Sequence, residues 1–119
     1  MKKEIINLLR KYNYEFHNKR LLGNPEYTSE ESKNKDLIQE IALIVNWLIV
    51  EHKLFLTVWH NTLTNKWRVD NIWDMTDKEY YDHTGEEYDV HTEAYLEGIK
   101  KTIELLEKNR TNIASTTEM

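Results

Sequence analysis

The stretch from Leu37 to Trp73 most constrains what this chain can fold into, because one strongly apolar segment is followed at once by two alternating ones. From Leu37 to about His52, apolar residues occupy nearly every side of a predicted helix. A helix that is apolar all round must be covered on more than one side. Residues 54–59 (LFLTVW) and 67–73 (WRVDNIW) then show the period of two that is typical of strands with one buried face. We therefore expect a buried helix followed by an antiparallel hairpin.

The apolar residues of this hairpin predict its register. Placing Val58 opposite Val69 across the connection 62–65 gathers the apolar side chains on one inner face, namely Leu54, Leu56, Val58, Trp67 and Val69. The same register pairs Trp59 with Arg68 on the outer face, in a cation–π contact worth about 0.5–1 kcal/mol. A slip of one residue would instead set the leucines opposite charged residues, so we favour the first register.

The N-terminal third is predicted to contain a helix and a connector. Apolar residues at helical spacing indicate an amphipathic helix over residues 3–17. Residues 18–35 are polar and rich in turn-forming residues, and we expect them to be a flexible connector. Thr28 and Glu31 form a possible capping box, so the second helix is expected to begin between Ser29 and Leu37.

After Trp73 the pattern is weaker. Thr76 and Glu79 favour a brief helical turn, and residues 87–90 favour a short third strand. The last helix is predicted from about Thr92 to Lys108, and the polar residues 109–119 are expected to form a disordered tail.

These elements predict an α+β fold in the order α-α-β-β-(β)-α. A small antiparallel sheet would pack on the long central helix and on the C-terminal helix. With 119 residues, of which 39% are hydrophobic, the chain suits one domain over residues 1–108 with its core in residues 36–108.

Composition excludes several classes of function. The net charge of −5 argues against binding a nucleic-acid backbone, and the absence of cysteine excludes disulfides, thiolate catalysis and cysteine zinc sites. No apolar run reaches the ~20 residues of a membrane span, and Glu4, Asn7 and Arg10 interrupt any export signal. We expect a cytoplasmic protein, monomeric or homodimeric, without a cofactor.

The segment from Asp74 to Glu97 is strongly acidic, with nine carboxylates and only Lys78 as a cation. One interpretation is a solvated loop followed by the acid-favoured first turns of a helix. The other is a surface that meets a basic protein partner, and charge alone does not separate the two.

The histidines suggest two weaker hypotheses. His83 and His91 flank the acidic segment, but their spacing matches no metal-binding template, so we predict no metal site. His60-Asn61-Thr62 fits one H-x-T element of two-histidine phosphoesterases, which need a second such element to supply both an acid and a base. A nucleotide-binding or phosphodiester-cleaving protein using His60 and Thr62 is therefore the alternative function.

The order of several segments resembles that of a known group of proteins, which indicates a biological setting for this chain. The segment WLIVEHKLFLTVWHN, the short hairpin ending in KW, the Tyr/Asp-rich loop and EAYLEGIKKTIELL resemble the layout of small uncharacterised proteins encoded by bacteriophages and prophages. The similarity covers roughly residues 37–108 and contains no diagnostic motif. It implies an intracellular accessory protein, with action on a bacterial host as one role, and it carries over no catalytic residues.

The leading functional hypothesis is therefore a non-enzymatic phage or prophage accessory protein that binds a protein partner through an acidic and aromatic surface. No catalytic residue is predicted. The expected binding residues are Trp59, Arg68, Trp73, Tyr81, Glu86, Glu87 and Tyr88.

Overall fold

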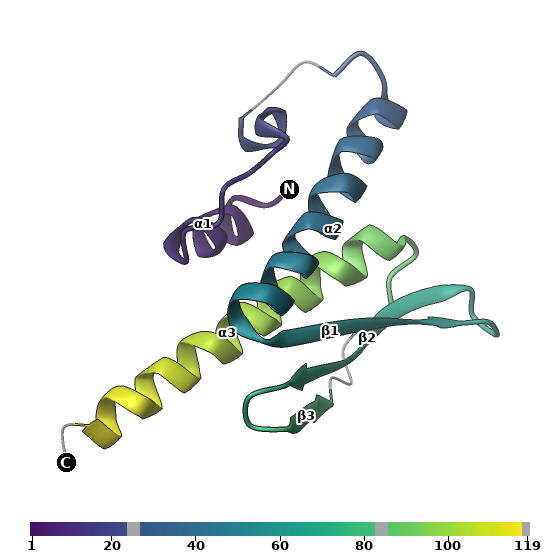
Figure 1. The fold of residues 1–119 in the computed structure, drawn as a ribbon. Helices are drawn as coiled ribbons and strands as arrows, with labels where there is room; N and C mark the ends of the chain where they lie inside the picture. Colours follow the sequence, from purple (N-terminus) through teal and green to yellow (C-terminus); the bar gives the residue numbers. More distant parts are fainter. Residues whose placement is uncertain (24–26, 83–85, 118–119) are drawn as a thin grey trace.

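The computed structural model describes residues 1–23, 27–82 and 86–117, and their elements follow the order α-α-β-β-β-α (Figure 1). The elements are α1 (Lys3–Lys11), the short 3₁₀ helix η1 (Lys19–Leu22), α2 (Glu30–His52), β1 (Leu54–Asn61), β2 (Lys66–Asp74), β3 (Glu79–Asp82) and α3 (His91–Thr117). The strands form an antiparallel sheet with β2 in the middle. Helices α2 and α3 contact the sheet, and α1 contacts α3. The predicted α+β class is confirmed.

The predicted hairpin register is also confirmed, because Val58 lies opposite Val69 and Trp59 opposite Arg68. The structure adds a β-bulge that the alternating pattern did not reveal. Asn71 pairs with Thr57 while Val69 pairs with Val58, so Asp70 is an extra residue in β2. The bulge changes the parity of the strand and extends its buried inner face to Ile72.

The third strand lies elsewhere than predicted. Instead of a helical turn, residues 75–78 form the tight turn of a second hairpin, and β3 follows it from Glu79. The carboxylate of Asp74 accepts hydrogen bonds from the backbone N–H groups of Thr76 at 2.9 Å and Asp77 at 3.2 Å, and Lys78 adopts a left-handed φ of 57°. Residues 87–90 make only an isolated bridge, between Tyr88 and Trp67.

Helix α1 ends at Lys11, six residues before the predicted end at His17, for a local reason. Asn13 adopts a left-handed φ of 66°. Its N–H donates to the carbonyl of Arg10 at 3.0 Å, and the N–H of Tyr14 donates to that of Leu9 at 3.1 Å. These two bonds form a Schellman C-cap, which ends a helix by satisfying its last carbonyls. The chain after the cap is not helical, yet Tyr14 and Phe16 are buried in the core.

Parts of the predicted connector, residues 18–35, are helical in the structure. Within it lie η1 and the first residues of α2, which starts at Glu30, and the side chain of Ser29 caps that helix by accepting from the N–H of Ser32 at 3.1 Å. The predicted start between Ser29 and Leu37 is therefore confirmed. Residues 24–26 of the predicted connector lie outside the described residues.

Helix α3 continues past the predicted end at Lys108 to Thr117, so the expected disordered tail is helical over most of its length. This stretch contains no glycine or proline, the residues that most disfavour a helix interior. Residues 118–119 lie outside the described part. Within the described residues, no helix combines the length and the apolar content that crossing a membrane requires.

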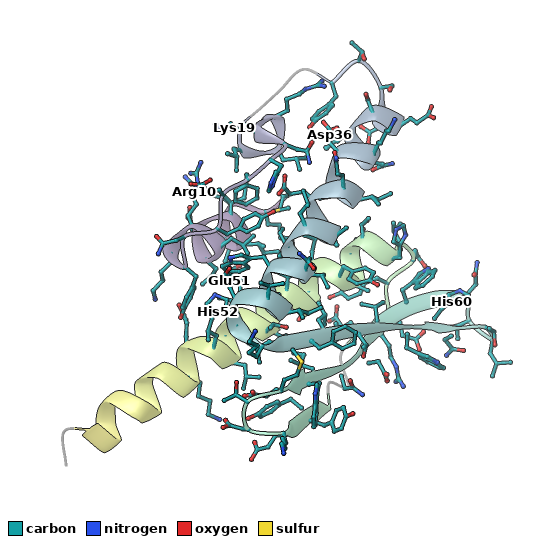
Figure 2. The ribbon with its side chains drawn as sticks, in the orientation of Figure 1. Arg10, Lys19, Asp36, Glu51, His52 and His60 are labelled. Atoms are coloured by element: carbon teal, nitrogen blue, oxygen red, sulfur yellow. The ribbon has the colours of Figure 1, made fainter. Side chains whose placement is uncertain are left out.

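A buried carboxylate fixes the N-terminal segment to α2, and the sequence pattern gave no sign of it. Glu40 is fully buried on α2 and accepts a hydrogen bond from the hydroxyl of Tyr14. It also accepts from the backbone N–H groups of His17 at 3.1 Å and Asn18 at 2.7 Å. Figure 2 shows the N-terminal segment running beside α2, with Lys19 near the end of the helix that carries Asp36.

Candidate functional site: the open face of the sheet

Three aromatic side chains form a row across the outer face of the sheet. Phe55 on β1 lies opposite Trp73 on β2, and Trp73 lies opposite Tyr80 on β3. The rings of Trp73 and Tyr80 have centroids 4.2 Å apart. Phe55 is 41% exposed and Tyr80 is 65% exposed. Large aromatic side chains gain free energy by burial, so this row is a surface suited to a partner.

A second pair of side chains continues this surface along the β1–β2 hairpin. The guanidinium carbon of Arg68 lies 4.5 Å from the centre of the Trp59 ring, which confirms the predicted cation–π contact. Trp59 is 41% exposed. We call the surface made of Phe55, Trp59, Arg68, Trp73 and Tyr80 the open face, because the helices lie on the other side of the sheet (Figure 1).

The bulge at Asp70 is the local reason that the open face extends along the whole hairpin. Without an extra residue, Arg68 and Trp73 would point to opposite faces, since side chains alternate along a strand. With Asp70 inserted, Arg68 faces outward opposite Trp59 and Trp73 faces outward opposite Phe55. Thr57 supports the bulge, because its hydroxyl accepts from the N–H of Asn71 at 3.3 Å.

The structure does not bring all the predicted binding residues together. Trp59, Arg68 and Trp73 lie on the open face, whereas Tyr81 lies opposite Ile72 and packs against the hydrophobic core. Its hydroxyl donates to Glu79 at 2.9 Å, and this bond, with burial and nearby carboxylates, raises the pKa of Tyr81 to about 12.

The remaining three predicted residues, Glu86, Glu87 and Tyr88, belong to the segment between β3 and α3. Glu87 accepts hydrogen bonds from Thr64 at 2.9 Å and from Asn61 at 3.2 Å, and these bonds lower its pKa. The Glu87 carboxylate therefore fastens the segment to the turn of the first hairpin. Glu86 is exposed beside it.

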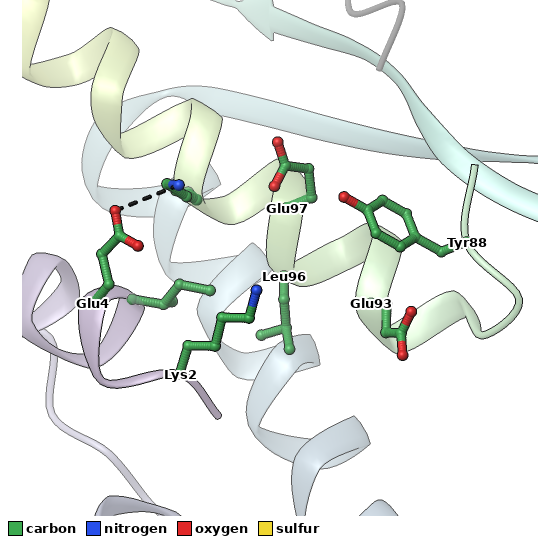
Figure 3. Close-up of a pocket in the computed structure, with 8 residues that line it drawn as sticks. Lys2, Glu4, Tyr88, Glu93, Leu96 and Glu97 are labelled. Atoms are coloured by element: carbon green, nitrogen blue, oxygen red, sulfur yellow. Dashed lines mark ion pairs between the residues drawn. The ribbon is translucent and has the colours of Figure 1, made fainter. Parts of the chain in front are cut away.

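Tyr88, together with two acidic residues of α3, lines a pocket of about 280 Å³ (Figure 3). Glu93 and Glu97 contribute carboxylates, while Lys2 and the Glu4–Lys100 ion pair, at 3.4 Å, close the side formed by α1. Partial burial and the neighbouring carboxylates raise the pKa of Tyr88. This pocket is lined by Tyr88, by residues of α1 and α3 and by Lys2, which precedes α1.

Two histidines of the described residues share one aromatic neighbour. His60 and His91 both contact the indole of Trp67, with ring centroids 4.4 Å and 5.6 Å away. His60 also bonds to the side-chain oxygen of Asn65 at 2.9 Å, in the hairpin turn that holds the exposed Thr62. Figure 2 shows His60 far from His52 and the end of α2. His83 lies outside the described residues, among which no group of three His, Asp or Glu side chains could hold a metal ion.

Phe55 and Tyr80 are the open-face residues that the predicted binding set lacks, and Tyr80 lies on a strand that was not predicted. The signal was present, because Glu79 to Asp82 follows a turn closed by Lys78, and a strand there would place Tyr80 and Tyr81 on opposite faces. Because a helical turn was predicted there instead, this alternation was not recognised.

No family model, curated protein or solved structure matches the chain.

Proposed function

We propose that this protein is a non-enzymatic binding module that recognises a protein partner through the open face of its sheet. The phage or prophage setting, the role as an accessory protein and the cytoplasmic location belong to the same proposal. The observation that supports it is the Phe55–Trp73–Tyr80 row, which spans all three strands in register with Phe55 and Tyr80 exposed and Trp73 partly exposed.

The chemistry of the open face favours a protein over a nucleic acid. Aromatic residues and arginine are enriched where protein interfaces concentrate their binding energy. Single-stranded nucleic acids also stack on aromatic rings, but their binding grooves are lined with cations that follow the phosphates. Arg68 is the one cation of the open face as defined here, and the whole chain carries a net charge of −5.

Site-specific photo-crosslinking tests the proposal. A photoreactive phenylalanine analogue replaces Tyr80 or, in a second version, Phe55, and the protein is irradiated in bacterial cells. We expect a discrete protein adduct from both positions, because both side chains would lie inside the interface. A Trp73→Ala change, in the middle of the row, should reduce the adduct from Tyr80 at least fivefold.

Leu63 provides the matched control position. It is 95% exposed at the tip of the first hairpin and lies outside the open face. The same analogue at Leu63 should give no such adduct. Equal adducts from Leu63 and Tyr80, or an adduct that Trp73→Ala leaves unchanged in a folded protein, would contradict recognition through this face.

A further inference from the structure

The guanidinium group of Arg68 has a buried donor atom that lacks a hydrogen-bond acceptor among the described residues. This donor is the Nε atom. Buried polar groups are nearly always paired, so an exception calls for a physical explanation. The centre of the Trp59 ring lies 4.5 Å from the guanidinium carbon, so the ring covers one face of the group.

We infer that Arg68 is a carboxylate-binding site within the open face, and that the partner segment carries an acidic side chain beside the apolar side chains that cover the aromatic row. The inference rests on the proposed function and names the chemistry of the partner. A planar guanidinium with free N–H groups matches a carboxylate in two parallel hydrogen bonds, which is the strongest pairing open to it.

The same chain contains a matched arrangement in which the carboxylate is present. Arg20 lies over the ring of Tyr27, with its guanidinium carbon 4.2 Å from the ring centre, much as Arg68 lies over Trp59. Arg20 also reaches the carboxylate of Asp36, at 3.9 Å. Of these two stacked arginines, Arg68 is the one that has no carboxylate within ion-pair distance among the described residues.

The acidic residue of the chain whose charge interacts with Arg68, Glu87, has hydrogen-bond donors of its own. Glu87 feels the charge of Arg68, but the hydrogen bonds from Thr64 and Asn61 dominate the lowering of its pKa and hold its carboxylate in place. A carboxylate from outside would meet little long-range attraction from a chain of net charge −5. At physiological ionic strength, however, charges beyond about 8 Å are largely screened, so the guanidinium dominates on contact.

The geometry also fixes where the acidic side chain would stand in the partner. Trp59, beside Arg68, is four residues from Phe55 along β1. At about 3.3 Å per residue, this is roughly 13 Å. A partner segment that lies extended along the strand would therefore carry its Asp or Glu about four residues from the apolar side chain that contacts the aromatic row.

NMR of the full chain tests the inference directly. The Nε–Hε signal of Arg68 is followed while indole-3-acetate is added, and the titration is repeated with the neutral indole-3-acetamide and with inorganic phosphate. We expect a saturable shift with indole-3-acetate and at least fivefold weaker binding of the amide and of phosphate. The Nε–Hε signal of Arg20, which already has Asp36, should not move.

Variants separate charge from stacking and from folding. Arg68→Gln should abolish the preference for the acid over the amide, whereas Arg20→Gln should leave it intact. Where Arg68→Gln fails to fold, Arg68→Lys replaces it, because lysine keeps the charge without the bidentate edge and should lower the preference at least threefold. Equal binding of acid and amide, or tighter binding of phosphate or of an oligothymidylate than of the acid, would overturn the inference.

The NMR and crosslinking experiments distinguish a failure of the carboxylate site from a failure of the proposed function. An adduct at Tyr80 that Arg68→Gln leaves unchanged would overturn the carboxylate site while the proposed function stands. An acid-specific shift at Arg68 without any adduct would support the carboxylate site and count against the proposed protein partner.

Discussion

Glu40 shows how a single residue fixes the position of a whole segment. Its carboxylate is fully buried and accepts from the Tyr14 hydroxyl, the backbone N–H groups of His17 and Asn18, and the side-chain amide of Asn18 at 3.1 Å. A buried carboxylate is costly unless such donors surround it. On a helix that is otherwise rich in apolar residues, Glu40 therefore specifies where the chain after α1 must lie.

Replacing Glu40 with alanine should lower the free energy of unfolding by about 3–5 kcal/mol, because it leaves several buried donors without their acceptor. Tyr14→Phe removes one donor and should lower it by about 1–2 kcal/mol. The control is Gln39→Ala, since Gln39 is an exposed neighbour on the same helix. Urea denaturation measures the free energy of unfolding of the three variants. A Glu40→Ala protein as stable as Gln39→Ala would contradict a stabilising role of the Glu40 carboxylate.

The same contact predicts how stability depends on alkaline pH. Burial and the hydrogen bond to Glu40 raise the pKa of the Tyr14 hydroxyl above its ordinary value of 10.0. The folded state therefore holds this proton more tightly than the unfolded state does. The contribution is present in full below pH 10 and is lost as the pH rises from 10 towards the raised pKa. Thermal melts between pH 8 and 12 should show a shallower alkaline decline for Tyr14→Phe than for the unchanged protein, and parallel declines would contradict this.

At the scale of elements, the features that the sequence predicted correctly depend on periodic patterns of apolar residues. The features that it did not predict depend on single residues. The period of two predicted the pairing of Val58 with Val69 and the contact between Trp59 and Arg68. The bulge at Asp70 breaks that period within one strand, and strict alternation from Val69 would place Ile72 on the outer face. A count of alternating residues contains no information about an extra one.

The predicted boundaries of α1 and of the third strand were wrong for a related reason. Asn13 ends α1 through its left-handed backbone, although the apolar spacing continues to Phe16. Lys78 likewise closes the β2–β3 turn with a left-handed φ. Residues other than glycine rarely adopt this conformation, so a lysine at this position does not predict a turn. As a result the outer-face pair of Trp59 and Arg68 was predicted, whereas the complete aromatic row was not, because it required a third strand.

At the scale of the whole molecule, one hydrophobic cluster joins elements that are far apart in the sequence. Leu9 of α1, Ile44 of α2, Leu56 of β1 and Ile103 of α3 are all buried in it. Helix α1 therefore has no separate core of its own. The open face lies on the other side of the sheet, so the residues proposed to bind a partner are largely distinct from those that form this cluster.

This arrangement predicts that the described chain unfolds as one cooperative unit, which two single-tryptophan versions can test. Trp47, whose ring lies 5.2 Å from that of Tyr14, reports on the N-terminal segment. Trp67, which contacts His60 and His91, reports on the sheet and on α3. With the other three tryptophans replaced by phenylalanine, the two versions should each show a fluorescence midpoint in urea that coincides with the midpoint of their own far-UV circular dichroism. A Trp47 midpoint that falls clearly below the circular dichroism midpoint of the same version would show instead that residues 1–22 detach first. In that case the bonds to Glu40 would hold a separable segment, because the shared core alone would not keep it in place.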